Sequence, residues 1–139
     1  MYLLDTNVIS ELRKLDSGRT DLRVRAWAGD VAASSQFLSA ITIMELELGA
    51  LQMERRDWRQ GALLRNWIER IILPGFEGRI LNVDALTARR CAALHVPDPC
   101  SYRDALIAAT ALVHSMTVVT RDVSHFERTG VAILNPWEY

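Results

Sequence analysis

The chain has 139 residues, of which 50% are hydrophobic, and a formal net charge of −1 at pH 7. This length predicts one domain, residues 1–139, with enough apolar mass for a core without disulfide support. The near-balanced charge excludes a strongly basic nucleic-acid-coating protein, and Cys91 and Cys100 have no metal-knuckle or redox spacing. With no charged signal region at Met1–Asp5 and no long apolar run, we expect a cytoplasmic protein without membrane contact.

Short apolar runs alternate with amphipathic stretches along the chain. Five runs predict strands whose apolar residues are mostly continuous rather than alternating, which is typical of a parallel sheet covered on both faces: Tyr2–Leu4, Gln36–Ala40, Arg79–Val83, Thr117–Thr120 and Val131–Leu134. Helices are expected over Thr6–Lys14, Asp21 to about Ala32, Thr42–Met53, Asp57–Leu73, Asp84–His95 and Ser101–His114. This alternation predicts an α/β fold, a three-layer α/β/α sandwich around a mainly parallel sheet of about five strands.

Four acidic residues fall at positions that such a sheet brings to one edge. Asp5 ends the first predicted strand and Asp122 follows the fourth, while Glu45 and Asp104 lie in the first turns of two predicted helices. In parallel α/β sheets, the carboxyl ends of strands and the N-termini of helices share the edge where ligands bind. The predicted topology therefore brings all four acids together.

Each acid also has a structural interpretation. Glu45 and Asp104 each follow a Thr or Ser by three residues, the spacing of a capping box, in which the acid bonds back to the helix start. Asp5 is placed to cap the first helix, and Asp122 to form a turn. As a set, however, the acids fit these roles less well. Asp5 ends an apolar strand and Asp104 opens a nearly all-apolar helix, so both carboxylates should be partly buried.

A cluster of partly buried carboxylates needs a counterion. Two unit charges about 5 Å apart repel by roughly 3 kcal/mol at an effective dielectric of about 20, and each helix N-terminus offsets only about 0.3–1 kcal/mol. Lys14 is the only lysine, and none lies near the acids to pair with them. The hard cations Mg²⁺ and Mn²⁺ bind a few carboxylates together with waters and phosphate oxygens. A metal at this edge would activate water for in-line displacement at phosphorus.

Five segments carry a family resemblance, and they occur in the family's order: Met1–Glu11, Ser39–Leu46, Asp104–Ala111, Thr120–Asp122 and Gly130–Trp137. They resemble PIN-domain toxins of the VapC type, especially the FitB-like branch. The resemblance covers nearly the whole chain and implies a PIN-like fold. It also implies an endoribonuclease that depends on Mg²⁺ or Mn²⁺ and cleaves single-stranded RNA.

The motif match implies a role for each of several side chains. The catalytic acids would be Asp5, Glu45, Asp104 and Asp122. The metal ligands would be Asp5, Asp104 and Asp122. The polar supports would be Thr6, Asn7 and Thr120. The resemblance further implies a homodimer and a cognate VapB/FitA-like antitoxin that blocks the site, with DNA contacted only through that antitoxin.

Two features leave alternatives open. Many relatives carry a further acid three residues after the Asp122 position, where this chain has His125; this histidine either approaches the phosphate or leaving group or is a surface residue. Arginines crowd the stretch from Arg55 to Arg70. They form either a solvated helix face or a contact surface for RNA or an acidic partner.

Other functional classes also place an aspartate after a first strand. Phospho-aspartate phosphatases of the HAD type need a second aspartate two residues later, where this chain has Asn7, and receiver domains need a late lysine, which is absent. A non-catalytic PIN-like module that only binds RNA or protein is the third alternative. The four-acid set argues against it, because a binding module gains nothing from crowded like charges.

Overall fold

The computed structural model describes residues 1–139. Its strands are β1 (Tyr2–Leu4), β2 (Gln36–Ser39), β3 (Ile80–Leu81), β4 (Thr117–Val119) and β5 (Ile133–Leu134). Its α-helices are α1 (Thr6–Leu12), α2 (Leu22–Asp30), α3 (Ala40–Arg56), α4 (Trp58–Trp67), α5 (Leu73–Gly75), α6 (Ala85–Leu94) and α7 (Tyr102–Val113). A π-helical turn joins α4 to α5 at Ile68–Ile72. Short 3-10 turns lie at Leu15–Ser17, Ala33–Ser35, Val123–His125, Glu127–Thr129 and Pro136–Glu138.

The five strands form one sheet in the order β3-β2-β1-β4-β5, and every neighbouring pair is parallel. β1 lies at the centre, with Leu3 opposite Phe37 of β2 on one side and opposite Val118 of β4 on the other. The predicted three-layer α/β fold with a parallel five-stranded sheet is confirmed. No helix is both long and apolar enough to cross a membrane.

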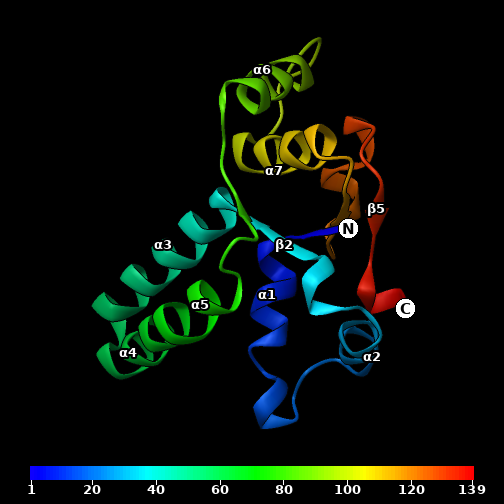
Figure 1. Ribbon diagram of the computed structural model, residues 1–139. Coiled ribbons are helices and arrows are strands. Elements are labelled where there is room, and N and C mark those ends of the chain that lie inside the picture. The colour runs from blue at the N-terminus through cyan, green and yellow to red at the C-terminus, as the bar shows by residue number, and fades with distance from the viewer.

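Successive residues of the central strands pack into two separate cores. Leu4 and Val119 belong to a core shared with α1, α2 and α3, whereas Leu3 and Val118 belong to a core shared with α7. Neighbouring side chains of a strand point to opposite faces, so a sheet covered on both faces needs strands that are apolar throughout. In Figure 1, α6 and α7 accordingly lie on one side of the strands, and α1 and α2 on the other.

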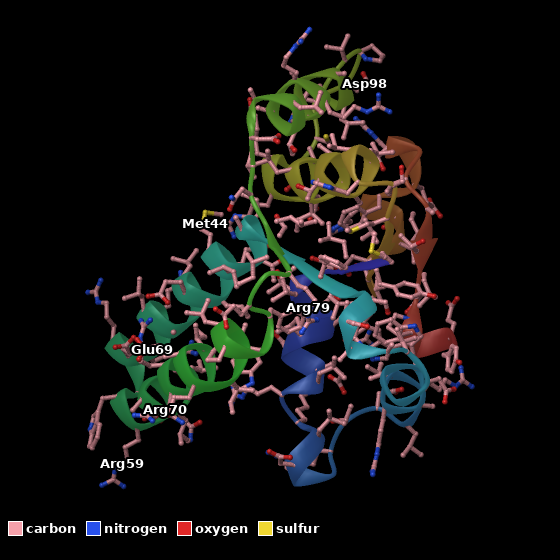
Figure 2. All side chains as sticks on the ribbon, viewed as in Figure 1. Met44, Arg59, Glu69, Arg70, Arg79 and Asp98 are labelled. Carbon is pink, nitrogen blue, oxygen red and sulfur yellow. The ribbon has the colours of Figure 1, made fainter.

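Helices α3 and α4 form a hairpin that extends away from the sheet (Figure 1). Asp57 ends α3, and its carboxylate caps the first turn of α4. On α4, Arg65 forms ion pairs with Glu47 and Glu54 of α3, which ties the two helices together. Figure 2 shows Arg59, another arginine of this stretch, at the outer end of the hairpin and projecting away from the sheet.

The start of α3 differs from the prediction. The helix begins at Ala40, because Ser39 caps it by accepting the backbone N–H of Ile41 at 3.0 Å. Thr42 is therefore an interior helical residue, fully buried, and its hydroxyl has no partner. Glu45 lies in the second turn. The predicted first-turn position of Glu45 and its alternative capping-box role are both wrong.

The predicted helix over Asp57–Leu73 changes its pitch near the end. Residues Ile68–Ile72 form a π turn, and the helix continues through Pro74 to Gly75. Proline has no N–H to donate, and its ring clashes with the carbonyl four residues earlier in a regular α-helix. The wider π turn relieves that conflict, which explains why Pro74 does not stop the helix where the sequence suggested.

Candidate active site

The centre of the sheet is a topological switch point. β1 leads into α1 on one face, whereas the chain that leaves its neighbour β4 carries Phe126 into the core on the other face. Chains that leave adjacent strands toward opposite faces open a crevice at the carboxyl edge of the sheet. Asp5 directly follows β1, and Thr120 and Asp122 follow β4, so these three residues border the crevice.

The structure brings all four predicted acids into one pocket of about 400 Å³ at this edge. The lining side chains are all polar: Asp5, Thr6, Asn7, Ser10, Glu45, Ser101, Arg103, Asp104, Asp122 and His125. Of the predicted supports, Thr6 and Asn7 line the pocket, and Thr120 lies fully buried behind it. Sequence elements separated by more than a hundred positions thus form a single acidic pocket.

Asp5 is the most deeply held of the acids, with only 6% of the residue exposed. Its Oδ1 accepts the backbone N–H of Thr6 at 2.8 Å, so Asp5 does cap α1, as its structural interpretation proposed. Its Oδ2 accepts the Thr120 hydroxyl at 2.7 Å and the Asn7 amide at 3.4 Å. These donors are all neutral, and no cationic side chain bonds to this carboxylate.

Asn7 and Thr120 link Asp5 to Asp122. The Asn7 side-chain amide donates to Asp122 Oδ2 at 3.1 Å, while its carbonyl oxygen accepts the backbone N–H of Arg121 at 3.3 Å. Thr120 Oγ1 accepts the backbone N–H of Asp122 at 3.0 Å. The loop after β4 is therefore fixed against α1, and the Asp122 carboxylate is held over the pocket although the residue itself is exposed.

Glu45 is oriented from two sides. The Thr6 hydroxyl donates to its Oε1 at 3.0 Å, and the Arg103 guanidinium lies 3.9 Å from its Oε2. As expected, no lysine pairs with the acids, but an arginine lies within ion-pair distance of Glu45. Sequence reasoning missed Arg103, although its place directly before Asp104, in the first turn of α7, puts it at the same edge.

His125 lies at the pocket, where its Nδ1 is 3.2 Å from Oδ2 of Asp104. It comes from the 3-10 turn that follows Asp122, and its side chain is 55% exposed. Ser101 caps α7 by accepting the backbone N–H of Asp104 at 3.5 Å, which places the Asp104 carboxylate at the helix start. His125 is thus an exposed residue in contact with the acidic set.

Two of the acids, Asp5 and Asp104, have pKa values raised above the ordinary value. The pKa of Asp5 is raised to about 6, mainly by burial. The hydrogen bonds from Thr120 and Thr6 oppose this rise, and the charges of Asp104 and Glu45 add to it. Burial also raises the pKa of Asp104, with the charge of Asp122 adding to the rise and His125 opposing it. Burial thus disfavours the charged forms of Asp5 and Asp104, and a cation bound beside them would favour those forms.

The donor set fits a hydrated hard cation. No three of the His, Cys, Asp and Glu side chains converge into a closed metal-binding group. Mg²⁺, however, keeps several waters and usually takes only one or two carboxylates from a protein, so an open pocket is the expected form of its site. Asp5, with a buried carboxylate and no cationic partner, is the strongest donor for such an ion.

The sheet order and the acidic pocket at its switch point agree with a known family, since residues 2–132 match the PIN domain. The chain belongs to the PIN domain family. It is 40% identical to the VapC ribonuclease Y4jK of Sinorhizobium fredii and 40% identical to Toxin FitB of Neisseria gonorrhoeae, each over 99% of both chains. It is also similar to the solved structure of FitAB bound to an IR36 DNA fragment, with a TM-score of 0.87, 39% identity, and coverage of 99% of this chain and 96% of the other. The predicted resemblance to VapC-type toxins of the FitB-like branch is confirmed.

Proposed function

We propose that residues 1–139 form one PIN-like domain that acts as an Mg²⁺- or Mn²⁺-dependent endoribonuclease on single-stranded RNA. One observation carries the proposal: four acids from four separate segments line a single pocket, and Asp5 is buried there without a cationic partner. Structural roles do not require such convergence. Membership of a family with a VapC ribonuclease at 40% identity supports RNA as the substrate.

In this proposal the metal is held by Asp5, Asp104 and Asp122, and Glu45 orients the attacking water next to it. The metal, when bound, lowers the pKa of a coordinated water and stabilises negative charge at phosphorus. The Thr6 hydroxyl donates to Oε1 of Glu45, and Arg103 lies 3.9 Å from Oε2, beyond hydrogen-bond distance. Oε2 therefore still has a lone pair with which to orient the attacking water and accept its proton. Thr120 and Asn7 keep the carboxylates of Asp5 and Asp122 in place.

The proposed biological role is the toxin of a toxin–antitoxin pair. The 40% identity to Toxin FitB and the similarity to a FitAB assembly bound to DNA support it. The partner would be a VapB/FitA-like antitoxin that blocks the acidic pocket, with DNA contacted only through that antitoxin. We also propose that the chain forms a homodimer, as VapC-type toxins do.

Metal removal and an Asp104→Asn substitution test this function. With labelled single-stranded RNA as substrate, we expect EDTA to abolish cleavage and added Mn²⁺ or Mg²⁺ to restore it. Asp104→Asn should lower kcat by roughly 10²-fold or more, because a charge aimed at the reacting centre is lost. Asp98→Asn is the matched control, since Asp98 is exposed in the loop between α6 and α7, away from the pocket (Figure 2). Cleavage that persists in Asp104→Asn or in EDTA would contradict the proposal, and metal-independent RNA binding would favour the non-catalytic module.

A second prediction concerns Thr120, whose buried hydroxyl donates to Asp5. In Thr120→Val that hydrogen bond to the carboxylate is lost, so the pKa of Asp5 should rise further. The acid limb of the pH–rate profile should then move to higher pH, and stability should fall by about 1 kcal/mol. Thr110→Val is the control, because the Thr110 hydroxyl bonds only within α7, to the Leu106 carbonyl. Superimposable pH–rate profiles for Thr120→Val and the parent would refute this role.

A further inference from the structure

The acidic pocket does not end at the acids. A second cavity of about 340 Å³ shares Thr6, Ser10 and Glu45 with it and runs between α1 and the α3–α4 hairpin. A third, of about 850 Å³, shares Ser10, Arg13 and Trp67 with the second and continues along the end of α1. The three cavities form one continuous depression that leads away from the acidic edge.

Positive charge dominates the outer part of this depression. Its cations are Arg13, Lys14, Arg19 and Arg56, and the acids of the same two cavities are Asp16 and, at the boundary with the acidic pocket, Glu45. Lys14 is paired with Glu11 at 2.8 Å, but none of the three arginines lies within ion-pair distance of a carboxylate. We name the side chains Ser10, Arg13, Arg19, Arg56 and Trp67 the basic groove. A chain whose net charge is −1 thus concentrates unneutralised arginines beside its acidic pocket.

The arginines are held in place without being neutralised. The Arg13 guanidinium lies over the Trp67 ring, 5.8 Å from its centroid, at the junction of the second and third cavities. Arg19 bonds to the Ser17 hydroxyl at 3.3 Å, and Arg56 contacts the sulfur of Met53 at 3.6 Å. Neutral contacts of this kind restrict a guanidinium while leaving its donors free for an anion.

We propose that the basic groove binds the backbone phosphates of the RNA strand on one side of the scissile bond. This inference rests on the proposed ribonuclease function. Arg13 lies seven residues beyond Thr6 along α1, about 10 Å at 1.5 Å per residue, so a strand leaving the acidic pocket reaches it directly. Arginines that carry no carboxylate partner suit phosphates, and the mostly polar lining suits a nucleic-acid backbone better than an apolar peptide.

The test is a binding measurement on the intact chain carrying Asp5→Asn, so that the RNA probe is not cut. A fluorescently labelled single-stranded RNA of mixed sequence is titrated at several KCl concentrations. The double variant Arg13→Gln and Arg56→Gln should bind several-fold more weakly, and its log–log salt dependence should become shallower by about 0.7 for each phosphate left without an arginine partner. In the active chain the same double variant should raise KM with little change in kcat, because binding beside the reacting bond is weakened.

Two further variants make the result specific. Arg89→Gln with Arg90→Gln removes the same charge from α6, on the other side of the sheet, and should leave the RNA affinity and the salt dependence unchanged (Figure 1). Arg13→Lys with Arg56→Lys keeps the charges and should restore the salt dependence, which excludes a simple folding defect. Equal salt dependence for the Gln double variant and the parent would overturn the proposal. So would intact RNA binding with lost affinity for a cognate antitoxin, since the groove would then be a protein site.

These outcomes are independent of those that test the nuclease itself. The proposed nuclease function is contradicted if RNA is cleaved without the acids or the metal. The proposed role of the basic groove is tested separately, by RNA affinity and its salt dependence measured without cleavage. If the chain cleaves RNA but binds it equally well with and without Arg13 and Arg56, the proposed nuclease function stands and the proposed role of the basic groove is wrong.

Discussion

Replacing Asp5 with asparagine will abolish RNA cleavage and, in the absence of metal, make the protein more stable. The carboxylate is buried, and its two oxygens accept hydrogen bonds only from neutral donors. Its charge is therefore unfavourable in the folded chain until a cation is bound. We expect Asp5→Asn to lower kcat by roughly 10²-fold or more while unfolding at a higher temperature than the parent in EDTA.

The pH dependence of this effect has a definite sign. The pKa of Asp5 is about 6 in the folded chain against an ordinary value of 3.8. Between these values the folded chain keeps a proton that the unfolded chain releases, so stability falls as pH rises through this window. At neutral pH the loss is about 3 kcal/mol. Asparagine carries no charge and so removes this loss of stability. It also accepts one hydrogen bond fewer than the carboxylate, which cancels about 1 kcal/mol of the gain.

The measurement is thermal unfolding of Asp5→Asn and the parent in EDTA at about pH 4 and pH 7. The stabilisation should be present at pH 7 and mostly lost near pH 4, where the folded carboxyl is protonated and the unfolded one is already partly protonated. Asp98→Asn, on an exposed loop, should show no such pH dependence. Addition of Mn²⁺ should reverse the order of stability, because only the parent retains the full ligand set. A parent that is the more stable protein at pH 7 in EDTA would contradict this account.

Gly61→Ala is the second substitution with a large expected effect, and it acts on the fold. Gly61 lies where α3 and α4 pack together, and an added Cβ would come within 2.5 Å of the Cα and 2.6 Å of the backbone nitrogen of Glu54. Backbone atoms cannot move aside as a flexible side chain does, so the helices must separate. We expect a loss of about 1–3 kcal/mol or more in the free energy of unfolding.

Gly29→Ala is the control for this substitution. Gly29 is also helical, in α2, but an added Cβ there meets no atom within 4 Å. Alanine should stabilise that helix by about 0.5–1 kcal/mol, because it restricts the unfolded chain. Urea denaturation of the two variants should therefore give shifts of opposite sign. Equal midpoints for Gly61→Ala and the parent would show that α3 and α4 can separate without loss.

The layout of the site follows from patterns that the sequence carries locally. Asp5 and Asp122 were placed correctly because strand ends are marked by the change from apolar to polar residues, and parallel strands share one edge. Asp104 was placed correctly because Ser101 caps α7 as predicted. Glu45 reaches the pocket although α3 begins two residues earlier than predicted, because an earlier helix start does not change the face on which Glu45 lies.

Other features depend on contacts that no local pattern encodes. The ion pair between Arg103 and Glu45 joins two helices that are distant in sequence, so neither residue alone announces it. The π turn at Ile68–Ile72 carries the same apolar stripe as a regular helix, and only the fit around Pro74 selects it. The basic groove is predicted only in part. Arg56 belongs to the arginine-rich stretch that the sequence offers as a contact surface, but it meets Arg13 only when α1 packs beside α3.

The dispersal of the acids along the chain has a consequence for the timing of activity. The carboxylates of Asp5 and Asp122 become neighbours only when β4 has paired with β1 at the centre of the sheet. A nascent chain on the ribosome therefore has no complete pocket until Asp122 has been made and β4 has paired with β1. Under the proposed function, a protease cut between Asp5 and Asp122, followed by separation of the pieces, removes the activity in the same way. Pairing of β4 with β1 is thus the step at which the proposed nuclease acquires its acidic site.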